Sequence, residues 1–253
     1  MILASCLLLL ATSLGEDQAI GAAAIDSDAV EAYRAGDHAA ALARWDELLC
    51  TRELAEAERS RLLYNAGNAA ARGGEWLAAV GYYSEALAGT PRDGDLWANL
   101  EHARREAGLE PEDRGDLAAT LGRLLSAWTE AEARWIAALG MVLLAAVLAH
   151  EALRGGRSGR TLAWVGLGLA LLMSTPLARH VLADEAQRVF IISDGPIALR
   201  SEPRADAQVL ERAKAGTWHR ELDRLGGWIG VRTRSGAKGW VPMSGVLALP
   251  SAP

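Results

Sequence analysis

The chain has 253 residues, 51% of them hydrophobic, and a formal net charge of −6 at pH 7. This length suits two small domains with additional membrane segments and argues against one large enzyme core. Residues 22–134 carry 21 acidic and 12 basic side chains, whereas residues 179–253 carry 8 and 11, so the C-terminal part is too weakly basic to indicate a nucleic-acid partner.

The N-terminus resembles a signal peptide, which we place at residues 1–15. An apolar stretch over residues 2–14 is too short to span a bilayer comfortably and is followed at once by Glu16. Small residues at Ser13 and Gly15 suit cleavage before that glutamate. No Lys or Arg precedes the stretch, which leaves open both the cleavage and the true start of the protein.

Residues 63–91 resemble a tetratricopeptide repeat along their whole length. The letters are LYNAGN at 63–68, GGEWLAA at 73–79 and YYSEAL at 82–87. In this pattern small residues stand where paired helices touch, an aromatic ring fills the gap between them, glycines make the turn and a proline ends the second helix. The small residues are Gly67, Ala79 and Ala86, and the aromatic ring is that of Tyr83. Gly73 and Gly74 make the turn, and Pro91 ends the second helix.

An earlier copy of the repeat covers residues 33–48 and places Trp45 in a later apolar position. It lies 38 residues upstream when the turn glycines Gly36 and Gly74 are aligned. That spacing exceeds the usual repeat of about 34 residues. We therefore place extra residues in the polar stretch 51–60, where they lengthen a helix or the turn between repeats.

A third unit at residues 96–107 supplies a single helix before Gly108 and Pro111 break the pattern. This helix is expected to cap the domain, which we bound at residues 22–110. Two repeats and a cap fall at the lower limit for burying a continuous core. We expect this domain to need its neighbours or a partner for full stability.

Repeats of this family usually bind peptide segments in a concave groove lined by the first helix of each pair. The resemblance places six residues on or near that face, where asparagine amides can hold an extended peptide backbone. They are Tyr64, Asn65, Asn68, Arg72, Asn99 and His102. The alternative, an ordinary solvated helix face, stays open.

Two uncharged apolar runs at residues 135–149 and 161–178 flank a loop that contains Arg154, Arg157 and Arg160. Each run, the first extended to residue 153, can just cross a hydrocarbon core of about 30 Å at about 1.5 Å per residue. Short arginine-rich loops stay cytoplasmic, so we expect a two-pass hairpin with both flanking domains on the other side. The alternative is a buried helical pair in a soluble protein.

Small residues are expected to let the two helices approach closely. These residues are Gly166 and Ala170 on the second helix, with Ala145 and Ala149 opposite them on the first.

Beyond residue 184 the pattern changes to alternating and β-branched residues with regular glycine and proline punctuation. The predicted strands are residues 189–192, 197–200, 217–222, 228–233 and 239–241. The last two form a hairpin that turns at residues 234–238, with Ile229 and Val231 on one face and Trp228 and Arg232 on the other. A small five-stranded all-β barrel follows, over residues 186–250.

This barrel resembles a bacterial SH3-like domain through LRSEP at 199–203, AGT at 215–217, GWIGVR at 227–232 and GWVP at 239–242. In such domains the residues at Arg200, Trp228 and Trp240 can border a ligand groove. Family members bind peptides or cell-wall fragments. The alternative, which we favour at this point, is that both tryptophans pack the barrel, since a small barrel needs large side chains.

No catalytic signature is present: the sequence lacks a phosphate loop, a paired-histidine zinc motif and a nucleophile elbow. We therefore expect no enzymatic activity, no cofactor and no metal site. After signal cleavage Cys50 is the only cysteine, so no internal disulfide forms. We expect it to be a small buried residue and not a reactive thiol.

The order of these segments resembles the E component of the Bat (aerotolerance-operon) proteins. The sequence LWANLEHARR at 96–105, which leads through a polar stretch towards the first span, also resembles that family. The fold is thus expected to be multidomain, with an all-α repeat domain, a two-helix transmembrane hairpin and an all-β SH3-like barrel. Its segments are residues 1–15 (signal peptide), 22–110 (repeats), 111–134 (linker or interfacial helix), 135–153 and 161–178 (spans), 154–160 (cytoplasmic loop) and 186–250 (barrel).

The resemblance implies an inner-membrane scaffold whose two domains face the periplasm. Its partners would be the lipid bilayer and other Bat-type subunits that contain von Willebrand-type domains, with no nucleic acid. A second hypothesis is a cell-wall sensor or anchor whose barrel binds peptidoglycan. A third, a soluble repeat adaptor with a buried hairpin, predicts extraction from cells without detergent.

Overall fold

The computed structural model describes residues 25–51, 54–110, 127–154, 159–182, 188–233 and 235–249. They fall into two compact units. The first holds the described residues up to Gly89, those of Asp93–Pro111 and those from Ala186 onward, and the second holds Thr90–Arg92 with the described residues of Glu112–Glu185. The predicted signal peptide, most of the linker and the centre of the arginine loop lie outside the described residues.

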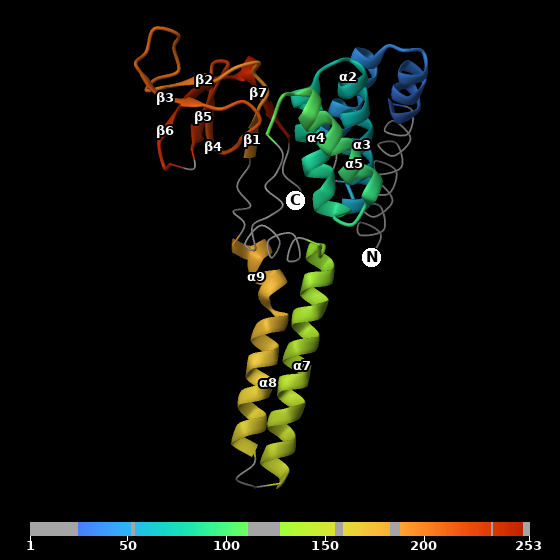
Figure 1. The fold of residues 1–253 in the computed structure, drawn as a ribbon, viewed down its shortest axis with the longest axis vertical. Helices are drawn as coiled ribbons and strands as arrows, with labels where there is room; N and C mark the ends of the chain where they lie inside the picture. Colours follow the sequence, from blue (N-terminus) through green and yellow to red (C-terminus); the bar gives the residue numbers. More distant parts are fainter. Residues whose placement is uncertain are drawn as a thin grey trace, which may run out of the picture. The chain divides into compact units, whose positions relative to one another are not determined.

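The N-terminal part of the first unit is helical throughout (Figure 1). A helix at residues 25–34 precedes α2 (His38–Thr51), α3 (Glu56–Arg72), α4 (Trp76–Gly89) and α5 (Gly94–Glu106). From α2 onward each helix packs against the next along the chain. The predicted turns are confirmed, because Gly36 and Gly74 have φ of 84° and 83°, a conformation that glycine adopts without steric cost.

Tyr83 fills the space between α3 and α4, as the sequence predicts. A Cβ built at Gly67 would lie 2.6 Å from Cε1 of the tyrosine ring, so only glycine fits at that point of contact. Ala79 and Ala86 are fully buried, and Trp45 is 2% exposed. Helix α4 ends at Gly89, two residues before Pro91.

The C-terminal part is an antiparallel sheet with strand order β3-β2-β6-β5-β4-β1-β7. The strands are β1 (Arg188–Ile191), β2 (Ile197–Arg200), β3 (Val209–Ala213), β4 (Trp218–Leu225), β5 (Trp228–Arg232), β6 (Lys238–Pro242) and β7 (Val246–Ala248). Ile229 and Val231 are fully buried while Trp228 and Arg232 are half-buried on the other face, as predicted.

The prediction of five strands was wrong, since the described residues contain seven. Strand β3 exposes most of its residues at the sheet edge, so it has no alternating apolar pattern to reveal it. Strand β7 has three residues, which is too short for such a pattern. Both strands are defined by backbone pairing, β3 with β2 and β7 with β1.

The barrel packs against α4 within this first unit. A Cβ at Gly81 would lie 2.7 Å from Cδ2 of Leu247 and 3.1 Å from Cδ1 of Phe190, so the missing side chain makes room for β7 and β1. Phe190 is 1% exposed and belongs to the same buried apolar cluster as the helices. The helical domain was expected to need a neighbour, and the barrel covers α4 in that way.

The second unit contains α7 (Glu130–Arg154), α8 (Gly159–Met173) and the short α9 (Thr175–Leu182). Helices α7 and α8 run side by side (Figure 1). Their close approach is at Gly140, where an added Cβ would lie 3.3 Å from Cα of Ala170. The prediction that Ala145 and Ala149 face the second helix was wrong, because both are exposed and the register places Gly140 opposite Ala170 instead.

The predicted run 161–178 is also not one continuous helix, because Ser174 separates α8 from α9. Pro176 has no N–H to offer the Leu172 carbonyl, which is its partner in regular helix geometry. The Thr175 hydroxyl takes over that bond at 2.7 Å, and the Ser174 hydroxyl donates to the Ala170 carbonyl at 2.8 Å. The backbone groups freed by the proline are therefore satisfied within the helix itself.

Helix α7 carries a strongly apolar and exposed surface. Among the described residues one helix, Glu130–His150, is long and apolar enough to cross a membrane, and 17% of its apolar window is buried. Trp135 and Met141 of α7 and Trp164 of α8 are 78%, 59% and 69% exposed. A helix from the core of a soluble protein would bury most of this surface. Helix α8 with its 15 residues spans only about 22 Å by itself.

Candidate interaction surfaces

Tyr64, Asn68 and Asn99 of the predicted groove lie together on the face formed by α3 and α5. The Asn99 side-chain amide donates to the Tyr64 hydroxyl at 3.2 Å, and the Tyr83 hydroxyl donates to Oδ1 of Asn68 at 2.7 Å. The Tyr64 and Tyr83 rings lie 6.1 Å apart. Burial and the neighbouring Tyr64 raise the pKa of the Tyr83 hydroxyl, so it remains a donor. We call Tyr64, Asn68 and Asn99 the amide face.

The other three predicted residues also belong to α3 and α5. Asn65 is half-buried, and Arg72 and His102 are exposed. The His102 ring meets the Trp76 ring edge-on at 5.5 Å, and its Nδ1 is 3.9 Å from a Glu106 carboxylate oxygen. The amide face thus has hydrogen-bonded side chains at its centre, and more exposed polar side chains belong to the same two helices.

A half-buried acid that the sequence did not reveal, Asp46, lies on α2. The Tyr82 hydroxyl donates to Oδ1 of Asp46 at 2.7 Å. Burial raises the pKa of the Asp46 carboxyl above its ordinary value, the bond from Tyr82 opposes this and the nearby Glu75 adds to it. The pair joins α2 to α4, so we assign it to the helical core.

The prediction that Cys50 is buried was wrong, because the residue is exposed at the end of α2. Its thiol pKa is nevertheless raised, first by partial burial and then by Asp46, with Arg224 and Arg59 acting in the opposite direction. A thiol with a raised pKa holds little thiolate at neutral pH and is a poor nucleophile.

The barrel brings Arg200, Trp228 and Trp240 onto one face of β2, β5 and β6. Arg200 stands opposite Trp240, and Trp240 stands opposite Gly230. Side chains directly opposite in antiparallel strands share a face. The Trp240 ring lies across Gly230, where an added Cβ would be 3.5 Å from Cζ3, and Trp228 precedes Gly230 by two residues on β5. We call Arg200, Trp228 and Trp240 the tryptophan face.

Both tryptophans lie on the outer side of the sheet and not in the barrel interior. Both are half-buried and lie on the side opposite Ile229 and Val231, and the buried core cluster contains neither. The buried apolar cluster of the barrel consists of aliphatic side chains. Arg200 donates from Nη1 to the Ala207 carbonyl at 2.8 Å, which holds its guanidinium beside the tryptophans.

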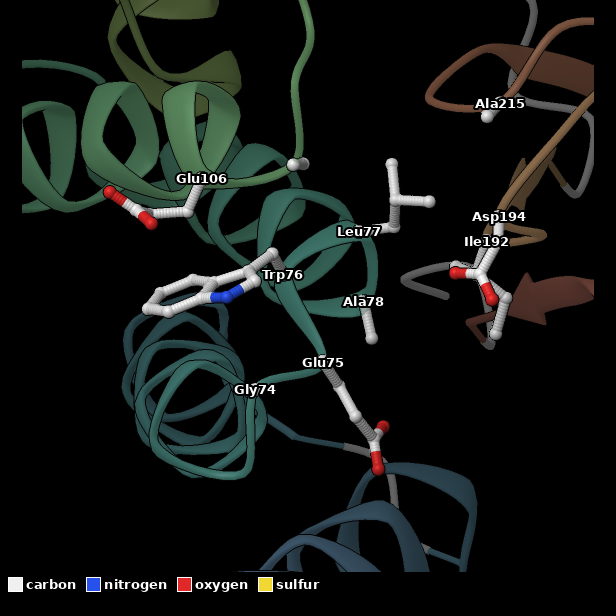
Figure 2. Close-up of a pocket in the computed structure, with 10 residues that line it drawn as sticks. Gly74, Glu75, Trp76, Leu77, Ala78, Glu106, Ile192, Asp194 and Ala215 are labelled. Carbon is white, nitrogen blue, oxygen red and sulfur yellow. The ribbon is translucent and has the colours of Figure 1, made fainter.

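A pocket of about 460 Å³ opens between the start of α4, the end of α5 and the barrel (Figure 2). It is lined by Gly74, Glu75, Trp76, Leu77, Ala78, Glu106, Ala107, Ile192, Asp194 and Ala215. Figure 2 shows the carboxylates of Glu75 and Glu106 pointing in different directions and Leu77 pointing across the pocket. In the part of the chain that the structure describes, no group of three or more His, Cys, Asp or Glu side chains is arranged to hold a metal ion.

Comparison with protein families finds a match to the bacterial SH3 domain over residues 193–246. This confirms the SH3-like domain predicted from the sequence, and such a domain suggests a role in protein interaction or in cell-wall binding. The match runs from just before β2 to the first residue of β7 and does not extend to the helices. Neither the comparison with curated proteins nor the comparison with solved structures finds a match.

Proposed function

We propose that this protein is a non-enzymatic scaffold that is anchored in a membrane and presents two interaction surfaces to partner proteins. One observation carries the proposal: the contact between α4 and the barrel uses Phe190 of β1 and Leu247 of β7. The tryptophan face lies on β2, β5 and β6, and the amide face lies on α3 and α5. Docking of the two domains therefore leaves both surfaces available.

The anchor in this proposal is a two-pass hairpin, with α7 as the first span and α8 as the second. The exposed apolar surface of α7 supports this anchor, because monomeric soluble proteins rarely expose so large an apolar patch. The arginine-rich connection faces the cytoplasm by the positive-inside rule. The helical domain and the barrel then both lie in the periplasm.

The helical domain is proposed to consist of tetratricopeptide repeats. The glycine turns at Gly36 and Gly74 and the contact of Tyr83 with Gly67 support this. Together with the order of the segments, these features favour a subunit of a Bat-type membrane complex. Its partners would be subunits with von Willebrand-type domains.

Purification from solubilised membranes tests the proposal. The tagged protein is crosslinked in native membranes and extracted in mild detergent, and the proteins that copurify with it are identified. We expect a discrete set of partners that is lost from a variant with Asn65→Ala and Asn68→Ala or from Trp240→Ala, and retained with Ala57→Ser at an exposed position. Recovery of only the unassembled protein would contradict a scaffold role.

Binding of peptidoglycan is the second candidate, since the bacterial SH3 match and the arginine beside two tryptophans also suit a cell-wall fragment. The detergent-solubilised protein should then sediment with purified sacculi. A variant with Trp228→Ala and Trp240→Ala should remain in the supernatant. Equal sedimentation of both proteins would remove this candidate.

A further inference from the structure

Strand register places four basic residues in line across the outer side of the barrel. Arg188 of β1 stands opposite Arg220 of β4, Arg220 opposite Arg232 of β5, and Arg232 opposite Lys238 of β6. Directly opposed residues of antiparallel strands share a face and have adjacent side chains. We call Arg188, Arg220, Arg232 and Lys238 the basic row.

Such a row is unfavourable unless an anion lies near it. Like charges that stand directly opposite one another destabilise a sheet, and Arg232 and Lys238 form such a pair. Nε of Arg232 is buried and makes no hydrogen bond to any of the residues that the structure describes. A buried donor without an acceptor costs free energy that an anionic group would recover.

One end of the basic row shows which kind of anion it accepts. Nη2 of Arg188 lies 3.1 Å from a carboxylate oxygen of Glu85 on α4, so a carboxylate from another element already neutralises this end. Arg232 and Lys238 lie on β5 and β6, which are separated from β1 by β4 in the sheet. They therefore offer the same chemistry to a carboxylate from outside the chain.

The surroundings of the row add an apolar component. Trp240 follows Lys238 two residues along β6 and lies on the same face. Alternate side chains of an extended peptide project to the same side about 6.6 to 6.8 Å apart, within reach of long basic side chains on strands about 4.8 Å apart. Asp223 stands opposite Gly230 beside Trp240 and would repel a polymer that is anionic at every unit.

We propose that the basic row binds an extended acidic segment of a partner protein, with carboxylates on Arg232 and Lys238 and apolar side chains against Trp240. This inference rests on the proposed scaffold role and names the chemistry of one partner. It adds a site beside Arg200, Trp228 and Trp240, because the carboxylates contact Arg232 and Lys238, which are not part of the tryptophan face.

The test uses the full chain in detergent micelles and a fluorescent nonapeptide with glutamate at every second position and glycine or leucine between. The matched peptide carries glutamine in place of glutamate. The row variant combines Arg232→Gln with Lys238→Gln. Its control combines Arg212→Gln with Lys214→Gln, which removes the same charge from exposed residues outside the row. Fluorescence anisotropy gives Kd over a range of salt concentrations.

We expect the acidic peptide to bind more tightly than the glutamine peptide. The row variant should bind it about three- to tenfold more weakly, with a shallower salt dependence, while the control keeps the Kd of the original protein. Lys238→Glu should weaken binding further. Both row variants should unfold at or above the temperature of the original protein, because they relieve repulsion.

Three results would overturn the inference: equal loss in the row and control variants, no binding of the acidic peptide, or row-dependent binding of vesicles rich in phosphatidylglycerol with no binding of peptide. The scaffold role is judged separately. If native partners still copurify with the row variant, the acidic-segment inference fails and the scaffold stands. If no partner copurifies with the original protein, the scaffold role itself fails.

Discussion

Arg188 of β1 lies 3.1 Å from the carboxylate of Glu85 on α4, measured from Nη2 to Oε1, and so connects residues that are 103 positions apart in the chain. The same guanidinium lies 5.4 Å from the centre of the Trp218 ring. Beside this ion pair, Phe190 and Leu247 fill the space above Gly81. Polar and apolar contacts thus join the helices and the barrel at the same place.

Replacement of Phe190 by alanine should loosen both domains. The side chain is 1% exposed, and truncation of a buried phenylalanine costs about 3 to 5 kcal/mol. Hydrogen exchange of the detergent-solubilised protein should speed up in α4 as well as in β1 and β7. Leu225→Ala at an exposed position of β4 is the control. Faster exchange in the barrel alone would show that the two domains do not stabilise each other.

Gly67→Ala should destabilise the helical domain despite the higher helix propensity of alanine. The new Cβ would lie 2.6 Å from the Tyr83 ring, which its bond to Asn68 holds in place. Overpacking of this kind costs about 1 to 3 kcal/mol, which we expect to appear in urea unfolding in micelles. Gly94→Ala, where nothing lies within 4 Å of the new Cβ, should leave the unfolding free energy unchanged or higher.

Asp46→Asn should stabilise the protein more as the pH rises. The pKa of the Asp46 carboxyl is raised above its ordinary value of 3.8, mainly by burial. The favourable contribution of the protonated form is complete below the unfolded pKa and is lost as the pH rises through the folded pKa. The variant keeps an acceptor for Tyr82 without the charge. Its gain in unfolding free energy should therefore be larger at neutral pH than below pH 4.

The control for this prediction is Asp28→Asn, which removes the same charge at an exposed position. The difference in unfolding free energy between Asp28→Asn and the wild-type protein should be nearly the same at neutral pH and below pH 4. If Asp46→Asn changes the unfolding free energy by the same amount at both pH values, burial does not destabilise the Asp46 carboxylate.

Thr175→Val should weaken the helical hairpin, whereas Thr175→Ser should not. Valine has nearly the shape of threonine but cannot donate to the Leu172 carbonyl, which Pro176 already leaves without its backbone donor. This bond is exposed, but in the proposed membrane location water cannot satisfy the carbonyl, and an acceptor left unsatisfied there costs about 1 to 3 kcal/mol. Unfolding of the protein in bicelles by SDS should show the loss. If Thr175→Val and Thr175→Ser are equally stable, water satisfies the Leu172 carbonyl and this bend does not lie inside the bilayer.

The sequence was sufficient to predict features that depend on local pattern. Glycines at positions 36 and 74 predicted both helical turns, and the alternation of Ile229 and Val231 with Trp228 predicted the inner and outer faces of β5. The SH3-like motifs predicted the fold of the barrel, which the family match confirms over residues 193–246.

Features that depend on contacts distant in sequence could not be predicted. Nothing near Gly81 indicates that Phe190 will pack there, and the basic row appears only when four strands take their register. The side of the sheet on which Trp240 packs could not be predicted for a related reason, because aliphatic residues such as Ile229 and Val241 form the buried cluster of the barrel. Side-chain size alone does not decide which face of a strand is buried.

Site-specific photocrosslinking in intact membranes tests the central claim most directly. A photoreactive amino acid is placed at Asn65, at Trp240 or, as a control, at the exposed Ala57. We predict discrete adducts with other proteins from the first two positions and none from the control. The claim is contradicted if all three positions give only uncrosslinked protein or the same pattern of adducts.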